Sequence, residues 1–155
     1  MAKRGQDCYT YYSSASTNYS SPSWVEITRV VNDTITPSGE EISGANRSSE
    51  YGSTDVGTKR FSGSLTYEYD DGDDTVYLAF RTAWANNSVI DMLFLDGTNA
   101  AGSGYRAPMK CVEVPQRRDL DSVVEVTLEL RSTTWDDSGT IREPTGWAAG
   151  SDVSL

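Results

Sequence analysis

Apolar residues at helical spacing mark one segment of a chain whose other regular segments alternate. Between residues 73 and 87, Val76, Phe80 and Trp84 recur every four positions, which predicts one face of an amphipathic helix with these three side chains packed on the core. Residues suited to the ends flank this pattern, and they are Asp73 or Asp74 for the start and Asn86 and Asn87 for the exit. The sequence therefore predicts one helix over residues 73–87.

Two segments alternate strictly between apolar and polar residues, which predicts strands with one face in the core and one face toward water. They cover residues 61–69 and 123–131. The residues expected to face the core are Phe61, Gly63, Leu65, Tyr67, Tyr69, Val124, Val126, Leu128 and Leu130. The residues expected to face away from it are Ser62, Ser64, Thr66, Glu68, Glu125, Thr127, Glu129 and Arg131.

Weaker patterns near the N-terminus predict further extended structure. Residues 24–31 read as a strand in which Val25 and Ile27 share one face. Residues 32–33, Asn-Asp, mark a bend, and residues 34–36 resume extended structure before a proline.

Three more short segments complete the expected β structure. Residues 8–12 form an aromatic run, residues 89–95 alternate directly after the helix, and residues 105–114 return as a hairpin partner after a turn-rich loop. Neither an internal repeat nor a linker divides the chain. The expected fold is thus one domain over residues 1–155, mainly β with one α-helix.

Two polar stretches lack any apolar pattern. Residues 38–60 are rich in Gly, Ser and charge, and so long a patternless stretch is either a surface loop or an arm that becomes ordered against a neighbouring subunit. Residues 136–155 turn polar after the last strand and are expected to form a C-terminal tail that docks weakly or on a partner.

The charge balance narrows the possible partners. The 155 residues carry a formal net charge of -10 and a sequence pI near 4.3. Wrapping nucleic acid by counterion release requires Lys and Arg, so this balance argues against it. An acidic surface can instead repel phosphate along a conduit, or simply keep a small protein soluble. No apolar run approaches the ~20 residues of a membrane span, so no membrane partner is expected.

The cysteine and histidine content excludes several kinds of site. The chain has no histidine and two cysteines, Cys8 and Cys111, in no C-x-x-C motif. A zinc site is therefore not expected, and two buried free thiols are favoured over a disulfide. Without histidine, Ser-His and Cys-His catalysis are also excluded, and neither a P-loop nor a G-x-G-x-x-G motif is present. We expect no enzyme, no cofactor and no metal.

One acidic cluster has two readings. Residues 70–74, Asp-Asp-Gly-Asp-Asp, offer carboxylate oxygens to Ca²⁺, but their spacing does not match an EF-hand. A strand-to-helix turn whose aspartates cap the helix is the favoured interpretation.

The order of these segments resembles the tail tube proteins of phages with long, non-contractile tails, a fold shared with the tube proteins of contractile tails and type VI secretion. The resemblance covers residues 20–135. The matching segments, in order, are residues 24–27, 31–36, 41–43, 47–49, 57–59, 61–69, 70–74, 77–80, 93–97, 101–104 and 124–131. The serine- and tyrosine-rich N-terminus and the tail containing Trp147 have no clear counterpart in that family.

The resemblance implies an antiparallel β-sandwich or partial barrel in a structural virion protein. Six such subunits form a ring, stacked rings form the tail tube, and DNA passes through the tube to the host without specific binding. The implied partners are copies of the chain itself and other tail proteins, such as the tape measure and the terminator. The implied location is the virion tail, assembled in the host cytoplasm.

Two surfaces follow from this resemblance as hypotheses. The residues expected to face the lumen are Ser62, Ser64, Thr66, Glu68, Glu125, Thr127 and Glu129. The residues expected in an inter-ring arm are Glu40, Glu41, Ile42, Arg47, Glu50, Tyr51, Asp55, Val56, Lys59 and Arg60. Exposed ion pairs contribute only about 0–1 kcal/mol each, so such an arm needs many copies or its apolar residues as well.

A binding module is the alternative function. Nine tyrosines and four tryptophans on an acidic, serine-rich β-sandwich suit a secreted or virion domain that binds carbohydrate or a receptor, because aromatic rings stack on sugars. Most of these aromatic residues lie on apolar faces, where core packing explains them. Salt-dependent self-assembly would favour the tube, and glycan binding by a stable monomer would favour the module.

Overall fold

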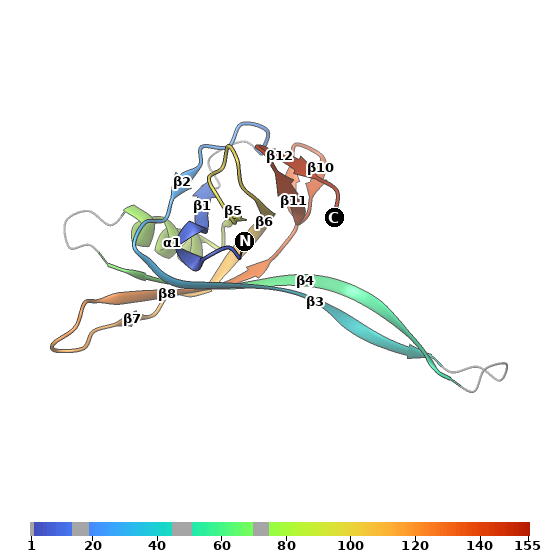
Figure 1. The fold of residues 1–155 in the computed structure, drawn as a ribbon, viewed down its shortest axis with the longest axis horizontal. Coiled ribbons are helices and arrows are strands. Elements are labelled where there is room, and N and C mark those ends of the chain that lie inside the picture. The colour runs from blue at the N-terminus through green and yellow to red at the C-terminus, as the bar shows by residue number, and fades with distance from the viewer. Residues whose placement is uncertain (1, 14–18, 45–50, 70–74) are drawn as a thin grey trace.

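The computed structural model describes residues 2–13, 19–44, 51–69 and 75–155 (Figure 1). A short 3-10 helix covers Gly5–Asp7, and the helix α1 covers Thr75–Asn86. The strands are β1 (Tyr9–Ser13), β2 (Val25–Glu26), β3 (Val30–Gly44), β4 (Ser53–Glu68), β5 (Val89–Leu95), β6 (Ser103–Glu113), β7 (Gln116–Arg117), β8 (Glu125–Ser132), β9 (Trp135–Asp137), β10 (Thr140–Arg142), β11 (Thr145–Ala148) and β12 (Ser151–Val153).

The strands form one large antiparallel sheet and one small hairpin. The large sheet runs β2-β1-β5-β6-β8-β4-β3, with β7 added to β8 and the pair β11–β12 added to β6. The described strands form an open path from β2 to β3, so the sheet curls into a partial barrel without closing. The prediction of a mainly β fold with one α-helix is therefore confirmed for the described residues.

The curled sheet and the helix enclose the main hydrophobic core. Leu65 and Tyr67 on β4, Leu128 on β8 and Met109 on β6 are fully buried in it, and so is Phe80 of α1, a helix that packs on β5 and β6. On β4 and β8 the burial alternates residue by residue, as the sequence predicts. Each strand thus contributes one apolar face to the core and leaves one polar face outside it.

The helix prediction is right in position but wrong for Trp84. Phe80 and Ala83 are buried and Val76 is half-buried, whereas Trp84 is 55% exposed. At about 100° per residue, eight positions turn a side chain about 80° away from the first, so the buried stripe continues from Phe80 to Ala83 instead. No helix in the described part of the chain is long and apolar enough to cross a membrane.

The exit of α1 confirms the predicted role of its two asparagines. Asn87 adopts φ 53°, the left-handed conformation common just after a helix. Its amide donates to the carbonyl of Trp84, and the amide of Ser88 donates to the carbonyl of Ala83 at 2.9 Å. These bonds satisfy carbonyls that the helix end leaves free. The predicted caps Asp73 and Asp74, and the acidic cluster 70–74 as a whole, lie outside the described residues.

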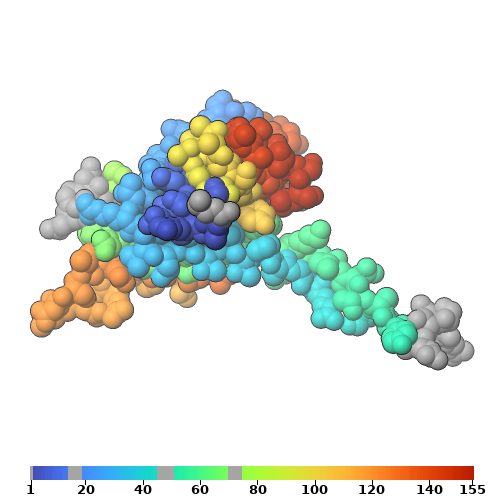
Figure 2. All heavy atoms as spheres, viewed as in Figure 1, coloured from blue at the N-terminus to red at the C-terminus, as the bar shows by residue number. Residues whose placement is uncertain are grey.

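Within the stretch 38–60, residues 38–44 and 53–60 form strands rather than a surface loop. They belong to β3 and β4, which pair from Val30 opposite Tyr67 out to Gly44 opposite Ser53, with two register shifts. The resulting hairpin projects from one end of the molecule (Figures 1 and 2). Its distal part is exposed on both faces, so no core imposes an apolar–polar alternation there and the sequence carries no strand signal.

The region before this hairpin also differs from the prediction. Only Val25–Glu26 of the expected strand 24–31 pairs with β1, and Arg29 adopts φ 60°. Val25 is 42% exposed while Ile27 is buried, so these two residues do not share a face. The bend expected at residues 32–33 is wrong, because β3 runs through both positions with its shift in register just before them.

The C-terminal segment is part of the fold and not a loose tail. β11 pairs with β6 along residues Thr145 to Ala148, and β12 pairs with β11. Trp147 packs with Leu93, Leu95 and Tyr11 in a second apolar cluster on the outer face of β5. β5 is therefore buried on both faces, with Ile90, Met92 and Phe94 in the main core.

The two thiols differ in environment, which corrects the expectation that both are buried. Both are free, but Cys8 is exposed and Cys111 is buried. Burial raises the pKa of the Cys111 thiol to about 11. Since the thiolate is the reactive form, Cys111 is held unreactive.

We therefore expect one thiol of the native, unassembled chain to react with a maleimide, and both to react in denaturant. Intact-mass spectrometry after brief labelling measures this. The Cys8→Ser variant serves as the control and should stay unlabelled until it is unfolded. Equal labelling rates of Cys8 and Cys111 in the native chain would contradict the assignment.

Candidate functional site

The predicted polar residues of β4 and β8 form one continuous surface. The strands pair so that Ser62 lies opposite Arg131, Ser64 opposite Glu129, Thr66 opposite Thr127, and Glu68 opposite Glu125. Directly opposed residues of antiparallel strands point to the same side, so these side chains share a face. We call this set the polar face, and it is the side of the sheet turned away from the main core.

Hydrogen bonds tie neighbouring side chains of the polar face together. The hydroxyl of Ser64 donates to a carboxylate oxygen of Glu129 at 3.0 Å, and the hydroxyls of Thr66 and Thr127 lie 3.1 Å apart. Arg131 lies 3.5 Å from the other oxygen of Glu129. These short side chains are thereby held flat on the sheet, and the face presents hydroxyl and carboxylate groups rather than apolar ones.

The polar face is acidic on β4 and β8, where three glutamates oppose one arginine and Glu68 lies directly opposite Glu125. Register also places Lys110 opposite Arg131, Glu113 opposite Glu129 and Arg117 opposite Glu125, so basic residues of β6 and β7 border the face. Register places Thr34 opposite Ser64 and Thr36 opposite Ser62, so β3 adds hydroxyl groups to the same face. Sequence reasoning missed these threonines because it placed a bend in β3.

The distal β3–β4 hairpin exposes one aliphatic side chain on each face. Ile42 is opposite Asp55, and Val56 is opposite Glu41, so Ile42 and Val56 point to different sides of the hairpin. They are 52% and 62% exposed. Each lies across a glycine of the other strand, because a methyl group added at Gly57 would meet Ile42 and one at Gly39 would meet Val56.

The charged residues expected in the arm are exposed along this hairpin. Glu40, Glu41, Asp55, Lys59 and Arg60 form no ion pair with any described residue of the chain. Tyr51 is exposed just before β4, while Arg47 and Glu50 lie outside the described residues. The hairpin thus carries apolar and charged groups available to another molecule.

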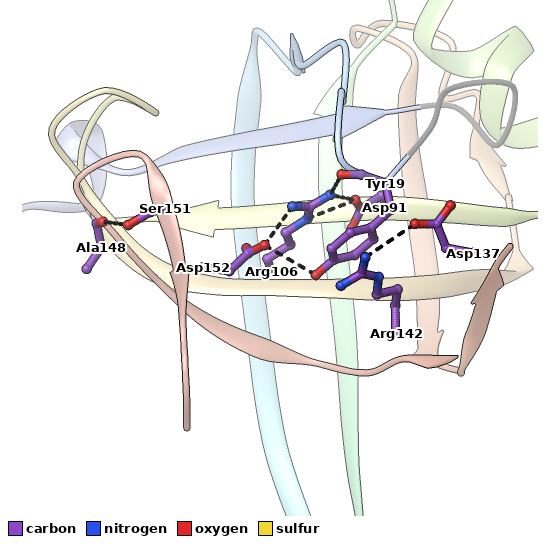
Figure 3. Close-up of polar contacts among 8 residues, drawn as sticks. All are labelled: Tyr19, Asp91, Arg106, Asp137, Arg142, Ala148, Ser151 and Asp152. Carbon is purple, nitrogen blue, oxygen red and sulfur yellow. Dashed lines mark hydrogen bonds and ion pairs between the residues drawn. The ribbon is translucent and has the colours of Figure 1, made fainter. Parts of the chain in front are cut away.

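A buried charge cluster lies in the upper part of the molecule in Figure 1, away from the polar face, and Figure 3 shows its residues. Arg106 on β6 is 3% exposed and donates from Nε and Nη2 to Asp91 of β5 at 2.9 and 2.7 Å. It also donates to Asp152 of β12 at 2.9 Å and to the carbonyl of Tyr19 at 2.7 Å. One side chain therefore links two core strands, the C-terminal strand and the N-terminal segment.

Aromatic rings and a second arginine complete this cluster. The guanidinium carbons of Arg106 and Arg142 lie 3.6 and 4.4 Å from the centre of the Tyr19 ring. The ring of Trp24 lies 5.1 Å from the Arg106 guanidinium, which is a cation–π distance. Arg142 also lies 3.5 Å from Asp137.

Burial controls the proton equilibria of the cluster. It raises the pKa of the Asp91 carboxyl, against the hydrogen bonds and positive charge of Arg106. It likewise raises the pKa of the Tyr19 hydroxyl, which the charge of Arg106 opposes. The ion pair with Arg106 therefore stabilises the charged form of Asp91 at a buried site that otherwise disfavours charge.

Sequence reasoning did not identify this cluster, although one signal was present. Asp91 interrupts the apolar run Val89–Leu95, and an acidic residue within a strand buried on both faces requires a partner. The partner Arg106 follows only from the pairing of β5 with β6. Asp152 and Tyr19 follow only from the way in which the two ends of the chain fold back.

Comparison with solved structures finds the same fold in tails and tail-like particles. The SPP1 tail tube matches with a TM-score of 0.70 and 16% identity over 95% of this chain and 80% of that one. The tail of an empty gene transfer agent particle matches at 0.66 and 14% over 92% and 98%. A chain of the anti-feeding prophage baseplate matches at 0.57 and 12% over 96% and 95%.

The sequence itself matches no protein-family model and no curated protein. The structural likeness, at these low identities, shows a shared fold along nearly the whole chain. The fold is that of phage tail tubes, as the order of the sequence segments predicts.

Proposed function

We propose that this chain is the structural subunit of a phage-type tail tube, in which six copies form a ring and rings stack around a channel for DNA. The observation that carries the proposal is the likeness to two tail structures over more than nine-tenths of the chain. The tail of the gene transfer agent was solved with helical refinement and C6 symmetry, which supports six subunits per ring here. On this proposal the chain is a virion component and not an enzyme.

The polar face is suited to bound the channel. Hydroxyl and carboxylate side chains cover β4 and β8, and three glutamates against one arginine leave the centre of the face acidic, with Lys110 and Arg117 at its border. DNA binding depends on Lys and Arg that displace counterions from phosphates, and an acidic wall offers few such contacts. DNA can therefore slide past this face without being held.

Side-by-side association of subunits has a ready edge in β3. This strand of 15 residues is the last in the sheet, and its outer backbone groups have no strand partner within the described chain. An exposed edge of this length tends to pair with another chain. A ring of subunits joined at such edges would turn six open sheets into one closed wall.

Stacking of rings has two complementary surfaces at opposite ends of the molecule. The β3–β4 hairpin projects at one end, and the turn between β7 and β8 lies at the other (Figure 1). Leu120 in this turn is 98% exposed, next to Arg117 and Arg118. The hairpin offers Ile42 and Val56, so a head-to-tail contact would pair these apolar side chains with Leu120. Arg117 is already paired with Asp119 at 2.6 Å, so the contact rests on the apolar groups.

The other proposed partners are the tail components that begin and end such a tube, a terminator and a tape measure within the channel. Assembly in the host cytoplasm belongs to the same proposal. The first test is to concentrate the purified chain and image it by negative-stain electron microscopy. Hollow rings or tubes support the proposal, and a monomer that stays dispersed even with a tail initiator complex contradicts it.

Reversing charge on the polar face should convert a non-binding channel wall into one that retains DNA. The double variant Glu125→Lys/Glu129→Lys leaves Glu68 as the only acid of the set, and it replaces the opposed pair of glutamates with an opposite-charge pair, so folding should be preserved. We expect salt-dependent retention of double-stranded DNA at about 0.1 M salt, and slower DNA release from particles that carry the variant.

Filter binding and a DNA-release assay measure these effects. The matched control is Glu26→Lys/Glu143→Lys, the same charge change at two exposed residues that lie on neither the polar face nor the hairpin. Normal assembly with unchanged DNA release in the Glu125/Glu129 variant would count against the polar face as the channel wall.

A further inference from the structure

A cavity of about 490 Å³ opens beside the buried charge cluster. Its walls come from the N-terminal segment 19–24, the loop before β6, and strands β6, β10, β11 and β12. The residues that matter for the argument are Tyr19, Trp24, Asn99, Arg142, Trp147 and Asp152. β11 and β12 lie above the sheet of β3, β4 and β8 in Figure 1, so the cavity is remote from the polar face and from the hairpin. Its volume is within the range of small-molecule sites.

Two indole rings form an aromatic wall of the cavity. Trp24 and Trp147 meet edge to face, with centroids 6.0 Å apart and planes at 85°. Trp147 is 7% exposed and is held in the second core cluster, whereas Trp24 is only partly buried. A rigidly supported aromatic wall at an open cavity can stack against the flat apolar face of a ligand.

Two residues that line the cavity each carry a hydrogen-bond donor without a partner among the described residues. The indole nitrogen of Trp147 and Nε of Arg142 are buried, and no described residue accepts from either. Buried polar groups are nearly always paired, and both of these groups can only donate. Both groups can therefore be satisfied by an acceptor oxygen.

The charges around the cavity favour a neutral source for that oxygen. Arg106 is already paired with Asp91 and Asp152, and Arg142 lies near Asp137. Two guanidinium groups thus face three carboxylates, and Asp152 itself lines the cavity. An anionic ligand would meet that carboxylate, whereas a hydroxyl group can accept from the indole and donate to Asp152.

We propose that this cavity binds a neutral saccharide unit. A pyranose ring combines a flat C–H face, which can stack on Trp24, with hydroxyl groups that both accept and donate. The proposal goes beyond the tube role and does not depend on it, because every residue of the cavity comes from one chain. If the polar face bounds the channel, the cavity lies toward the outside of the tube, where it would meet the glycans of a cell surface.

The test uses the unassembled chain labelled with ¹⁵N and titrated separately with cellobiose, maltose and N,N′-diacetylchitobiose. The four indole N–H resonances report directly on the four tryptophans. We expect at least one of these sugars to shift the Trp147 resonance with a Kd of about 1 mM or tighter, while the exposed Trp84 on α1 stays unmoved. Glucuronate, compared with glucose, should bind more weakly.

Substitution of Trp24 checks the stacking contact. Trp24→Leu keeps apolar volume without the ring and should weaken binding at least about tenfold, while Trp24→Phe should retain it within about threefold. Trp84→Leu is the matched control and should bind as the parent chain does. No shift at Trp147 with any of the three sugars, equal binding by Trp24→Leu, or tighter binding of glucuronate than of glucose would overturn the proposal.

Discussion

Replacing Ile42 and Val56 together with aspartate should abolish tube assembly and leave the subunit folded. Both side chains are more than half exposed on the distal hairpin and contact no core cluster, so the isolated chain loses little by their removal. If the hairpin docks on the next ring, each aliphatic group buried there contributes about 1.5–3 kcal/mol per contact. Two such losses, repeated around each ring and compounded by added negative charge, exceed what a stacking contact can tolerate.

Sedimentation and electron microscopy of the concentrated variant measure the effect, and the melting temperature reports on folding. Leu120→Asp, at the opposite end of the molecule, should give the same assembly defect because it alters the proposed receiving surface. Ile141→Asp is the matched control, since Ile141 on β10 has a similar exposure but lies on neither surface. Normal tubes from the Ile42/Val56 variant would refute the hairpin as the stacking contact.

Arg106→Met should strongly destabilise the folded chain. It removes the partner of Asp91, which is 2% exposed, and it releases Asp152 and the carbonyl of Tyr19. Breaking a buried ion pair in this way costs about 3–5 kcal/mol of unfolding free energy. Arg131→Met is the control, because Arg131 is exposed and its pairing with Glu129 is worth about 0–1 kcal/mol.

The stability lost in the Arg106→Met variant should increase as the pH rises. Burial raises the pKa of Asp91 above its unfolded value, and losing Arg106 raises it further. A carboxyl group whose pKa is higher in the folded chain than in the unfolded chain stabilises the fold at a pH below the unfolded-state pKa. This stabilisation is lost as the pH rises through the folded-state pKa. Urea unfolding from pH 4 upward should therefore show a widening gap between Arg106→Met and the parent chain.

The double variant Asp91→Leu/Arg106→Met should recover most of the lost stability, because it removes both buried charges. A gap in unfolding free energy that is small and independent of pH would contradict the role assigned to the cluster.

Elements that bury one face were predictable from the sequence, because burial imposes a period. The strands at 61–69 and 123–131 and the helix have this property, and all three are present. The helix and the second strand are close to their predicted bounds, whereas β4 begins at Ser53, eight residues before the predicted start. The polar face followed with them, since a strict alternation fixes which residues share a side. Only the contribution of β3 was missed.

Elements that bury no face, or that depend on partners far along the chain, were not predictable in the same way. The distal hairpin is exposed on both sides, so its residues show no alternation. β11 and β12 are held by partners more than 40 residues away in the sequence. Trp147 of β11 packs in the second apolar cluster, and Asp152 of β12 accepts a hydrogen bond from Arg106. Such contacts leave no local pattern, and a polar C-terminal segment resembles a tail until its partners are known.

A helical reconstruction of the assembled chain by cryo-electron microscopy tests the central claim most directly, because it gives the radial position of every strand. The account predicts a hollow tube of stacked rings with Ser64 and Glu129 of the polar face innermost, and β11 and β12 at larger radius. Filaments without an axial channel, or a tube whose polar face points outward, would contradict it.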